Sequence, residues 1–264
     1  MLNSVKQYFK QHTFFYIKYH PLIYKNWIRF RAPKGYKEIE KEQSMYQQFS
    51  QTNFGNEGNA LIYDVGANEG LLTEVFLQYG NVIAVEPDEF SQRVLKYRFL
   101  KHKKFRLLPL AISNKNGEQH FFVQQSGSAL NTLSEKWRTI IEDGKFGFSN
   151  QFSKHAVKTV TLDSLIQKFG MPNYIKIDTE GHELAVIQGL TKPVQLLSFE
   201  ANLPEFLAET IVIIDVLTSV SPEYQFTFFA NYEQQLPNYV DSNTFKDILA
   251  NLQYSSIDVF CKHI

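Results

Sequence analysis

Residues 60–88 read ALIYDVGANEGLLTEVFLQYGNVIAVEPD, and this stretch constrains the fold more than any other. An apolar run ends at Asp64, and a turn of small residues with Gly66 and Gly70 follows it. Apolar residues from Leu71 onward then recur at steps of three and four, which is typical of the buried face of a helix. A second apolar run ends at Glu86. Strand, glycine turn, helix and strand in this order predict the first unit of an open parallel sheet.

The order of residues in the turn indicates which ligand it binds. A dinucleotide site uses G-x-G-x-x-G, whereas this turn reads D-x-G-x-N-x-G, with Asn68 at the second glycine position. The acids Asp64 and Glu69 disfavour a diphosphate and favour a cationic nucleoside such as S-adenosylmethionine (SAM). Glu86 lies 22 positions after Asp64, near the spacing of about 20 residues at which an acid reaches a ribose. An ordinary glycine turn without a ligand is the alternative.

Length and composition set broad limits on the class of protein. The 264 residues fit one domain plus an extension, and 44% hydrophobic residues are ample for a core. The net charge of zero gives no sign of a nucleic-acid partner. The single cysteine, Cys261, rules out an internal disulfide and fits a reducing compartment. No apolar run reaches the ~18 residues of a membrane span, and lysines interrupt any signal-peptide core, so we expect a cytoplasmic protein.

The neutral total conceals a basic, aromatic N-terminal segment. Residues 1–37 carry eight Lys or Arg residues and no Asp or Glu, and aromatic residues are interleaved with them. Such a segment can lie on a membrane surface or a polyanion. It can also pack its aromatic residues on the catalytic domain or on a second copy of the chain, and this is the interpretation we favour. Pro21 and Pro33 are expected to divide it into helical pieces. We place the helical extension at residues 1–52 and the main domain at residues 53–264.

Acids follow four of the expected strands. A third strand over residues 105–112 ends in AIS, a hairpin strand is expected over residues 118–123, and residues 126–131 read as a flexible loop. Residues 174–177 form a central strand that ends at Asp178, and residues 194–199 form a strand that ends at Glu200. Together with Asp64 and Glu86, these acids are predicted to point into one crevice at the edge of the sheet. An acid at a strand end can instead cap the next helix.

Five motifs in order carry a resemblance to a known family. DVGANEG, AVEP, AIS, TLDSL and IKIDTEGHE, spread over residues 58–202, resemble the FkbM family of class I methyltransferases. The resemblance implies a doubly wound α/β fold with a mostly parallel, Rossmann-like sheet of seven strands. It implies SAM as the methyl donor and a hydroxyl acceptor on a sugar, a glycan or a related small metabolite.

The resemblance also implies residue roles. Glu86 with Pro87 would hold the ribose, and the segment Ala111, Ile112 and Ser113 would hold the adenine. The residues implied around the rest of the cofactor are Asp64, Gly66, Ala67, Asn68, Gly70 and Asp178.

Methyl transfer to an alcohol benefits from a general base, since the hydroxyl pKa is high. His182, Asp178 and Glu180 are the nearby candidates, and His182 titrates near neutrality if it is unperturbed. Asp178 and Glu180 can instead bind a divalent cation, although we expect no metal site. Two other functions remain open: a nicotinamide-dependent oxidoreductase, and a catalytically silent protein that binds a partner through its N-terminal segment.

Overall fold

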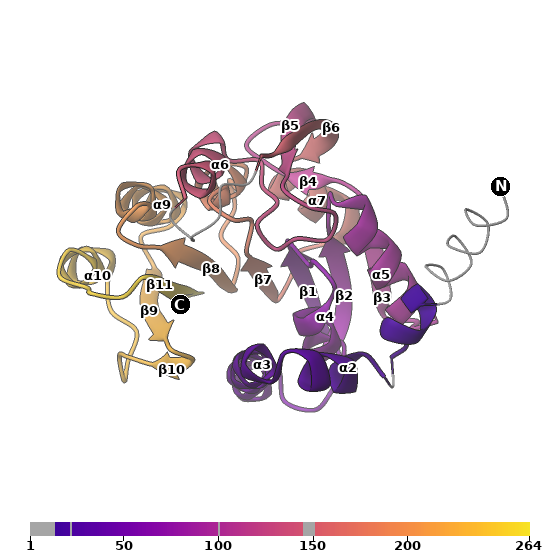
Figure 1. Ribbon diagram of the computed structural model, residues 1–264. Helices are drawn as coiled ribbons and strands as arrows, with labels where there is room; N and C mark the ends of the chain where they lie inside the picture. The colour runs from indigo at the N-terminus through magenta and orange to yellow at the C-terminus, as the bar shows by residue number, and fades with distance from the viewer. Residues whose placement is uncertain (1–13, 22, 100, 145–150) are drawn as a thin grey trace, which may run out of the picture.

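The computed structural model describes residues 14–21, 23–99, 101–144 and 151–264 (Figure 1). Its main sheet has the strand order β10-β9-β11-β8-β7-β1-β2-β3. The strands from β8 to β3 are parallel, whereas β11, β9 and β10 add antiparallel pairs at one edge. Their bounds are β1 Ala60–Val65, β2 Gly80–Val85, β3 Phe105–Leu108, β7 Tyr174–Ile177, β8 Leu196–Asn202, β9 Tyr224–Ala230, β10 Glu233–Gln234 and β11 Ser256–His263.

The predicted α/β, mostly parallel sheet is confirmed, with one strand more than the expected seven. The eighth strand, β10, has two residues at the edge of the sheet, so no sequence periodicity could reveal it. A second sheet was not predicted. It has the order β4-β6-β5, with bounds β4 Ala111–Ile112, β5 Gly117–Val123 and β6 Ser153–Val160.

The second sheet corrects two expectations. The single strand expected over residues 105–112 is two strands, β3 and β4, in two different sheets. Pro109 lies between them, and its missing N–H group cannot continue a strand ladder. The strand over residues 118–123 pairs antiparallel with β6 rather than with a neighbouring strand of a local hairpin.

Helices cover both faces of the main sheet, because alternate residues of each strand point to opposite sides. Ile62 packs with the helices of one face, which we call the α3 face, and Tyr63 packs with those of the other. The α3 face carries α3 Pro33–Phe54, α4 Leu71–Phe76 and α5 Glu89–Phe99. The opposite face carries α7 Leu162–Phe169, α8 Glu183–Ile187, α9 Leu207–Val220 and α10 Ser242–Leu249. Further helices are α2 Tyr24–Arg31 and α6 Glu135–Glu142.

Helix α3 fixes the extension to the main domain. Pro33 lies in its first turn, as expected of a residue whose missing N–H group costs nothing there. Tyr46 and Phe49 are buried against the sheet, and the Tyr46 hydroxyl donates a hydrogen bond of 3.0 Å to Asp258 Oδ1 on β11. The helix ends at Phe54, so the predicted boundary between residues 52 and 53 lies inside its last turn.

The described part of the N-terminal segment packs on the same face of the protein. Phe15, Tyr19 and Tyr24 are buried in one cluster with Val94 of α5. Phe30 is 84% exposed, so not every aromatic residue of the segment packs against the main domain. The expectations for residues 1–13 lie outside the described residues. Among the described helices, none combines the length and the apolar character needed to cross a bilayer.

Candidate functional site

The turn between β1 and α4 depends on backbone conformations that few side chains adopt. Gly66 and Gly70 both have a φ of 81°, and Asn68 has a φ of 46°. A Cβ atom at position 66 would lie 1.7 Å from the carbonyl oxygen of Asp178. The turn after β1 and the segment after β7 therefore touch through their backbones, and only glycine fits this approach.

Glu86 connects the end of β2 to the glycine turn. Its Oε2 accepts a hydrogen bond of 2.8 Å from the backbone N–H of Asn68, and its Oε1 accepts one of 2.7 Å from Asp88. Burial raises the pKa of Glu86 to about 7, although these hydrogen bonds partly oppose the shift. Each carboxylate oxygen has a second lone pair, so the group can accept further hydrogen bonds from a ribose.

Asp64 is fully buried on β1 and has one unsatisfied oxygen. Thr73 Oγ1 donates a hydrogen bond of 2.5 Å to Asp64 Oδ2, whereas Oδ1 has no hydrogen-bond partner. Burial raises the pKa of Asp64, and the nearby Lys176 opposes that shift. A buried acceptor without a partner is costly in a folded protein. A ligand with a cationic donor, such as the ammonium group of SAM, would satisfy it.

Most residues predicted for the cofactor line one pocket, the cofactor pocket, at the carboxyl ends of β1, β2 and β7. The predicted residues in its wall are Gly66, Asn68, Glu86, Pro87, Ala111, Ile112 and Asp178. Asp64 and Ala67 line the cavity next to it. Gly70 lets the turn pack closely against α5, since a Cβ atom there would lie 2.5 Å from the Phe99 side chain and 2.6 Å from that of Leu95.

His182 lines one side of the cofactor pocket, and Ser113 is fully buried next to it. His182 Nε2 lies 3.1 Å from Ser113 Oγ, and the imidazole lines the pocket beside Ala111 and Ile112. Burial lowers the pKa of His182 to about 4. The histidine therefore does not titrate near neutrality, because its surroundings disfavour the charged form. A neutral imidazole with this pKa is a weak base.

Lys176 is a buried cation in the middle of β7. Its Nζ donates a hydrogen bond of 2.9 Å to Asp178 Oδ2, and it pairs in register with Asp64 of β1. Burial opposes the charge, but Asp178 and Asp64 outweigh burial and raise the pKa of Lys176. Lys176 therefore stays charged at neutral pH.

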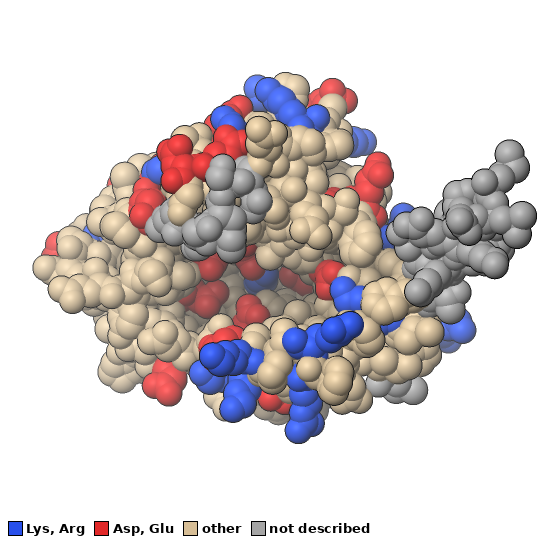
Figure 2. Space-filling model, in the orientation of Figure 1, with Lys and Arg blue, Asp and Glu red and all other residues tan. Residues whose placement is uncertain are grey.

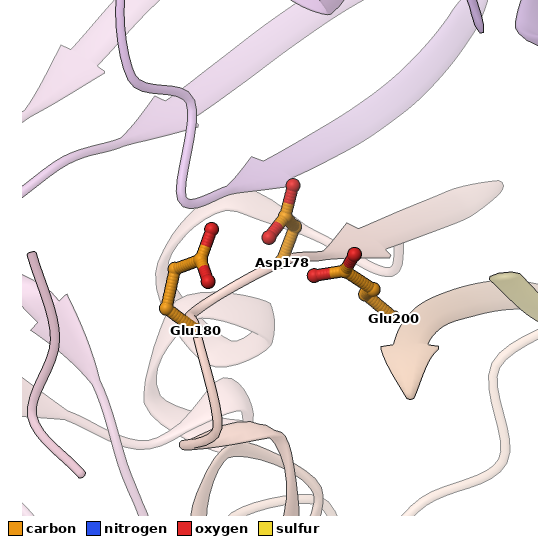
Figure 3. Close-up of side chains that lie close together, drawn as sticks. All are labelled: Asp178, Glu180 and Glu200. Atoms are coloured by element: carbon orange, nitrogen blue, oxygen red, sulfur yellow. The ribbon is translucent and has the colours of Figure 1, made fainter. Parts of the chain in front are cut away.

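Three acids converge beside the carboxyl end of β7. Asp178, Glu180 and Glu200 each place one carboxylate oxygen within 4.8 Å of the others (Figure 3). Glu200 pairs in register with Asp258 of β11, so a fourth acid lies beside the group. Strand β8 continues to Asn202, which means that Glu200 lies inside the strand and not at its end as predicted.

Burial and mutual repulsion raise the pKa values of these acids. Burial, followed by repulsion from the neighbouring carboxylates, raises the pKa of Glu180 and Glu200 well above the usual range. Burial likewise raises the pKa of Asp258 to about 6. These surroundings therefore favour the protonated forms of Glu180 and Glu200, and a bound cation would favour the ionised forms.

The same three carboxylates are the described group that suits a metal ion, because Mg²⁺ and Ca²⁺ prefer oxygen ligands. Lys176 already supplies one positive charge to Asp178. The absence of a metal site, expected from the sequence, stays a prediction.

A second cavity, which we call the acceptor cavity, adjoins the cofactor pocket on the α3 face. The extension contributes Lys18, Tyr24, Ile28, Ile39 and Glu42 to its wall, and the sheet contributes Asp64, Lys176 and Asp178. Gly66, Asn68, Ala129 and Asp178 line both spaces, so the two adjoin each other at these residues. Figure 2 shows a hollow at the centre of this side of the molecule, with acidic side chains on its wall.

Sequence reasoning missed part of this site. The expected flexible loop over residues 126–131 is held over the cofactor pocket by Asp88, which accepts hydrogen bonds from Gly127 N at 3.1 Å and Asn131 Nδ2 at 3.2 Å. Glu42 and Lys176 were also missed. Lys176 had a signal, since it is the one charged residue of the buried strand YIKI.

Comparison with known proteins agrees with the resemblance in the sequence. The Methyltransferase FkbM domain matches residues 64–255. The Hexuronic acid methyltransferase AglP of Haloferax volcanii is 26% identical over 171 residues. The match covers 63% of this chain, and the chain spans 60% of the length of that relative.

Two solved structures have a distant likeness. An rRNA methylase from Streptococcus thermophilus has a TM-score of 0.46 at 8% identity, covering 83% of this chain and 95% of that one. The plantazolicin methyltransferase BpumL, in complex with S-adenosylhomocysteine (SAH), has a TM-score of 0.44 at 9% identity, covering 99% and 100%. Both likenesses are too distant to bear on substrate or mechanism.

The residues present fit the cofactor of the matched family. The unpartnered Oδ1 of Asp64 suits the ammonium group of SAM, and Glu86 has free lone pairs for ribose hydroxyls. The family match spans well over half of the chain. The chain therefore belongs to the FkbM family of methyltransferases, with S-adenosylmethionine as its cofactor.

Proposed function

We propose that the protein transfers the methyl group of SAM to a hydroxyl oxygen of a sugar, a glycan or a related small metabolite. The observation that carries the proposal is that the cofactor pocket and the acceptor cavity adjoin each other and share the lining residues Gly66, Asn68, Ala129 and Asp178. A methyl donor in the first space can then meet an acceptor in the second. The relative AglP is named for a hexuronic acid, which supports a sugar acceptor.

The proposal assigns a role to each part of the cofactor pocket. Glu86 receives the ribose hydroxyls, and the segment Ala111–Ile112 with Ser113 holds the adenine beside His182. Asp64 and the turn at Gly66 and Asn68 hold the methionine end. When bound, SAM supplies a methyl group that its sulfonium already activates, so the protein mainly positions the reactants and excludes water.

The charges in the acceptor cavity favour a neutral acceptor over an anionic one. Glu42, Asp64 and Asp178 line it, and the buried cation Lys176 is already paired with Asp178. An acceptor carboxylate there would meet these acids, and among the described lining residues Lys18 is the one cation outside the Lys176–Asp178 pair. The excess of like charge is unfavourable in a partly buried space. A sugar hydroxyl is neutral and can donate a hydrogen bond to any of these carboxylates.

The three predicted proton acceptors differ in their surroundings. Asp178 is ion-paired with Lys176, and Glu180 lies among other acids that favour its protonated form. His182 lies beside Ser113, on the side of the cofactor pocket where we place the adenine. All three remain proposals for residues that contact the reactants.

Calorimetry with SAM, SAH and NADH tests the proposed cofactor use. We expect SAM and SAH to bind and NADH not to bind, whereas binding of NADH alone would favour an oxidoreductase. Glu86→Gln should weaken SAH binding by about 1–3 kcal/mol, the scale of a lost hydrogen bond to a charged group. Glu89→Gln, an exposed position three residues on in α5, is the matched control and should change nothing.

Transfer of radiolabelled methyl groups from SAM then tests the acceptor. We expect label in neutral methyl hexosides or glycans and less in free hexuronates. Binding of SAM with no transfer to any sugar would favour a catalytically silent protein.

A further inference from the structure

Glu42 is placed in the acceptor cavity by contacts on either side of it along α3. Ile39, Glu42 and Tyr46 lie three and four residues apart, so they share one face of the helix. The Tyr46 hydroxyl is held by Asp258 Oδ1 at 3.0 Å, and Gln43 Nε2 donates a hydrogen bond of 2.6 Å to the carbonyl oxygen of Leu71. These bonds fix the helix against β11 and α4. Glu42 therefore faces the acceptor cavity from a rigid position.

The charged groups around Glu42 come from three strands of the main sheet. Lys176 lies on β7 and Asp178 just after it, Asp64 lies on β1 and Asp258 on β11. Burial, together with the nearby charge of Glu42, raises the pKa of Tyr46 on the same helix and of Tyr232 beside β10. Burial raises the pKa of Glu42 to about 7, with Lys176 opposing the shift and the acids adding to it.

Among the carboxylates that line the acceptor cavity, Glu42 is the one without a partner in the described part of the chain. Thr73 holds Asp64, Lys176 holds Asp178 and Tyr19 holds Glu69, each at 2.9 Å or less. Within the described part of the chain, no hydrogen bond or ion pair engages the carboxylate of Glu42. A partly buried carboxylate left free on the wall of a cavity is available to a ligand.

Resting on the proposed function, we infer that Glu42 is the general base of the reaction and contacts the acceptor hydroxyl in this cavity. The hydroxyl proton passes to the Glu42 carboxylate as the acceptor oxygen forms a bond to the methyl carbon. The carbon–sulfur bond breaks and its electron pair stays on sulfur, which leaves SAH and the methyl ether. Lys176 and Asp178 lie across the cavity, where they position the acceptor.

This assignment gives the extension a role in the chemistry. The family match begins at residue 64, so Glu42 lies outside it. The residues that complete the acceptor cavity then belong to the part of the chain that the family domain does not include. A domain that starts at residue 53 would lack its base.

The SAM analogue sinefungin tests the inference without a known acceptor. It carries an ammonium group in place of the methyl group, so a carboxylate that faces the methyl position binds this ammonium. We expect sinefungin to bind the full-length protein more tightly than SAH does. Glu42→Gln should weaken sinefungin binding about tenfold or more, as for a lost charge-assisted hydrogen bond, and leave SAH binding unchanged.

A control on the same helix separates this effect from a general one. Glu38 lies one turn before Glu42, is exposed and pairs with Lys41. Glu38→Gln should change neither affinity, and melting curves of both variants report whether each is folded. Equal losses for sinefungin and SAH in Glu42→Gln, or no loss for either, would overturn the inference. If the unmodified protein binds neither compound, the proposed function itself fails.

Discussion

The two halves of the site are built in different ways. Around β1 and β2, acids are held by groups close in the sequence: Asp64 by Thr73, and Glu86 by the N–H groups of Asn68 and Asp88. Around β7, β8 and β11, the contacts join distant segments, and Tyr46 reaches Asp258 across 212 positions. The cofactor half is thus specified locally, whereas the acceptor half depends on the packing of the whole fold.

This difference bears on how each half can vary. A local motif keeps its geometry when the rest of the chain changes, which suits a cofactor common to a family. An acceptor cavity walled by α3 and the extension can change its lining without disturbing that motif. Replacing one glycine in each half by alanine tests whether the two halves lose different amounts of stability and of SAH affinity.

The largest effect is expected from Gly66→Ala compared with Gly181→Ala. Both glycines have a positive φ, but a Cβ atom at position 66 would meet backbone at 1.7 Å, whereas at position 181 it would meet the ring of Phe206 at 2.7 Å. A backbone clash cannot relax, so Gly66→Ala should cost about 3 kcal/mol or more and abolish SAM binding. The Phe206 ring can move, so Gly181→Ala should cost about 1–2 kcal/mol.

Urea unfolding and calorimetry with SAH measure these two costs. Equal losses of stability and of SAH affinity in the two variants would show that both turns are equally constrained. The contrast between the halves would then be wrong.

The fold was largely readable from the sequence because its signals are local and periodic. The strand predicted to end at Asp64 extends one residue further to Val65, and the strand predicted at residues 174–177 has those bounds. The division at Pro109 and the pairing of β5 with β6 were not readable. Strand pairing over a long separation depends on which surfaces meet, and no local pattern records that.

The site, like the fold, could be predicted from the sequence only where it depends on local motifs. Glu86, Gly66 and Asn68 belong to a motif of fixed spacing, and the structure places them in one pocket. Glu42 could not be recognised, because it is one of several acids in a polar helix that shows no functional pattern. The low pKa of His182 was equally hidden, because burial is a property of the assembled fold.

A smaller effect is expected from the contact between the extension and the glycine turn. The hydroxyls of Tyr19 and Tyr24 both donate hydrogen bonds to the carboxylate of Glu69, which lies in that turn. Tyr24→Phe removes one of them from a buried position, so we expect a loss of stability of about 1–2 kcal/mol. SAM affinity should fall about threefold to tenfold, because the turn is less well held.

Tyr97→Phe is the matched control for this contact. The Tyr97 hydroxyl also joins the extension to the domain, through a hydrogen bond of 3.2 Å to the carbonyl oxygen of Tyr16, but it does not touch the turn. We expect SAM affinity to be unchanged in this variant by calorimetry. A weaker affinity in Tyr97→Phe, or an unchanged one in Tyr24→Phe, would show that the extension does not act through Glu69.

The smallest effect is the dependence of stability on pH, which compares the buried acids with the buried histidine. Burial raises the pKa of Glu42, Glu86 and Glu183 to about 7 in the folded protein, whereas unfolded glutamates titrate near about 4.3. Between these values the folded state binds protons that the unfolded state does not. The stability from these acids is therefore present at low pH and is lost as the pH rises through about 7. His182 acts in the opposite sense, because its folded pKa of about 4 lies below the unfolded value.

Three acids outweigh one histidine, so the protein without SAM should melt about 2–4 °C higher at pH 6 than at pH 8. Calorimetric melting at constant ionic strength measures this difference. Glu86→Gln should reduce it and His182→Asn should enlarge it, since each removes one of the opposing groups. Saturating SAM should also reduce it, because ribose hydroxyls favour the ionised form of Glu86. A melting temperature that rises from pH 6 to pH 8 would mean that these glutamates ionise in the folded protein as easily as in water.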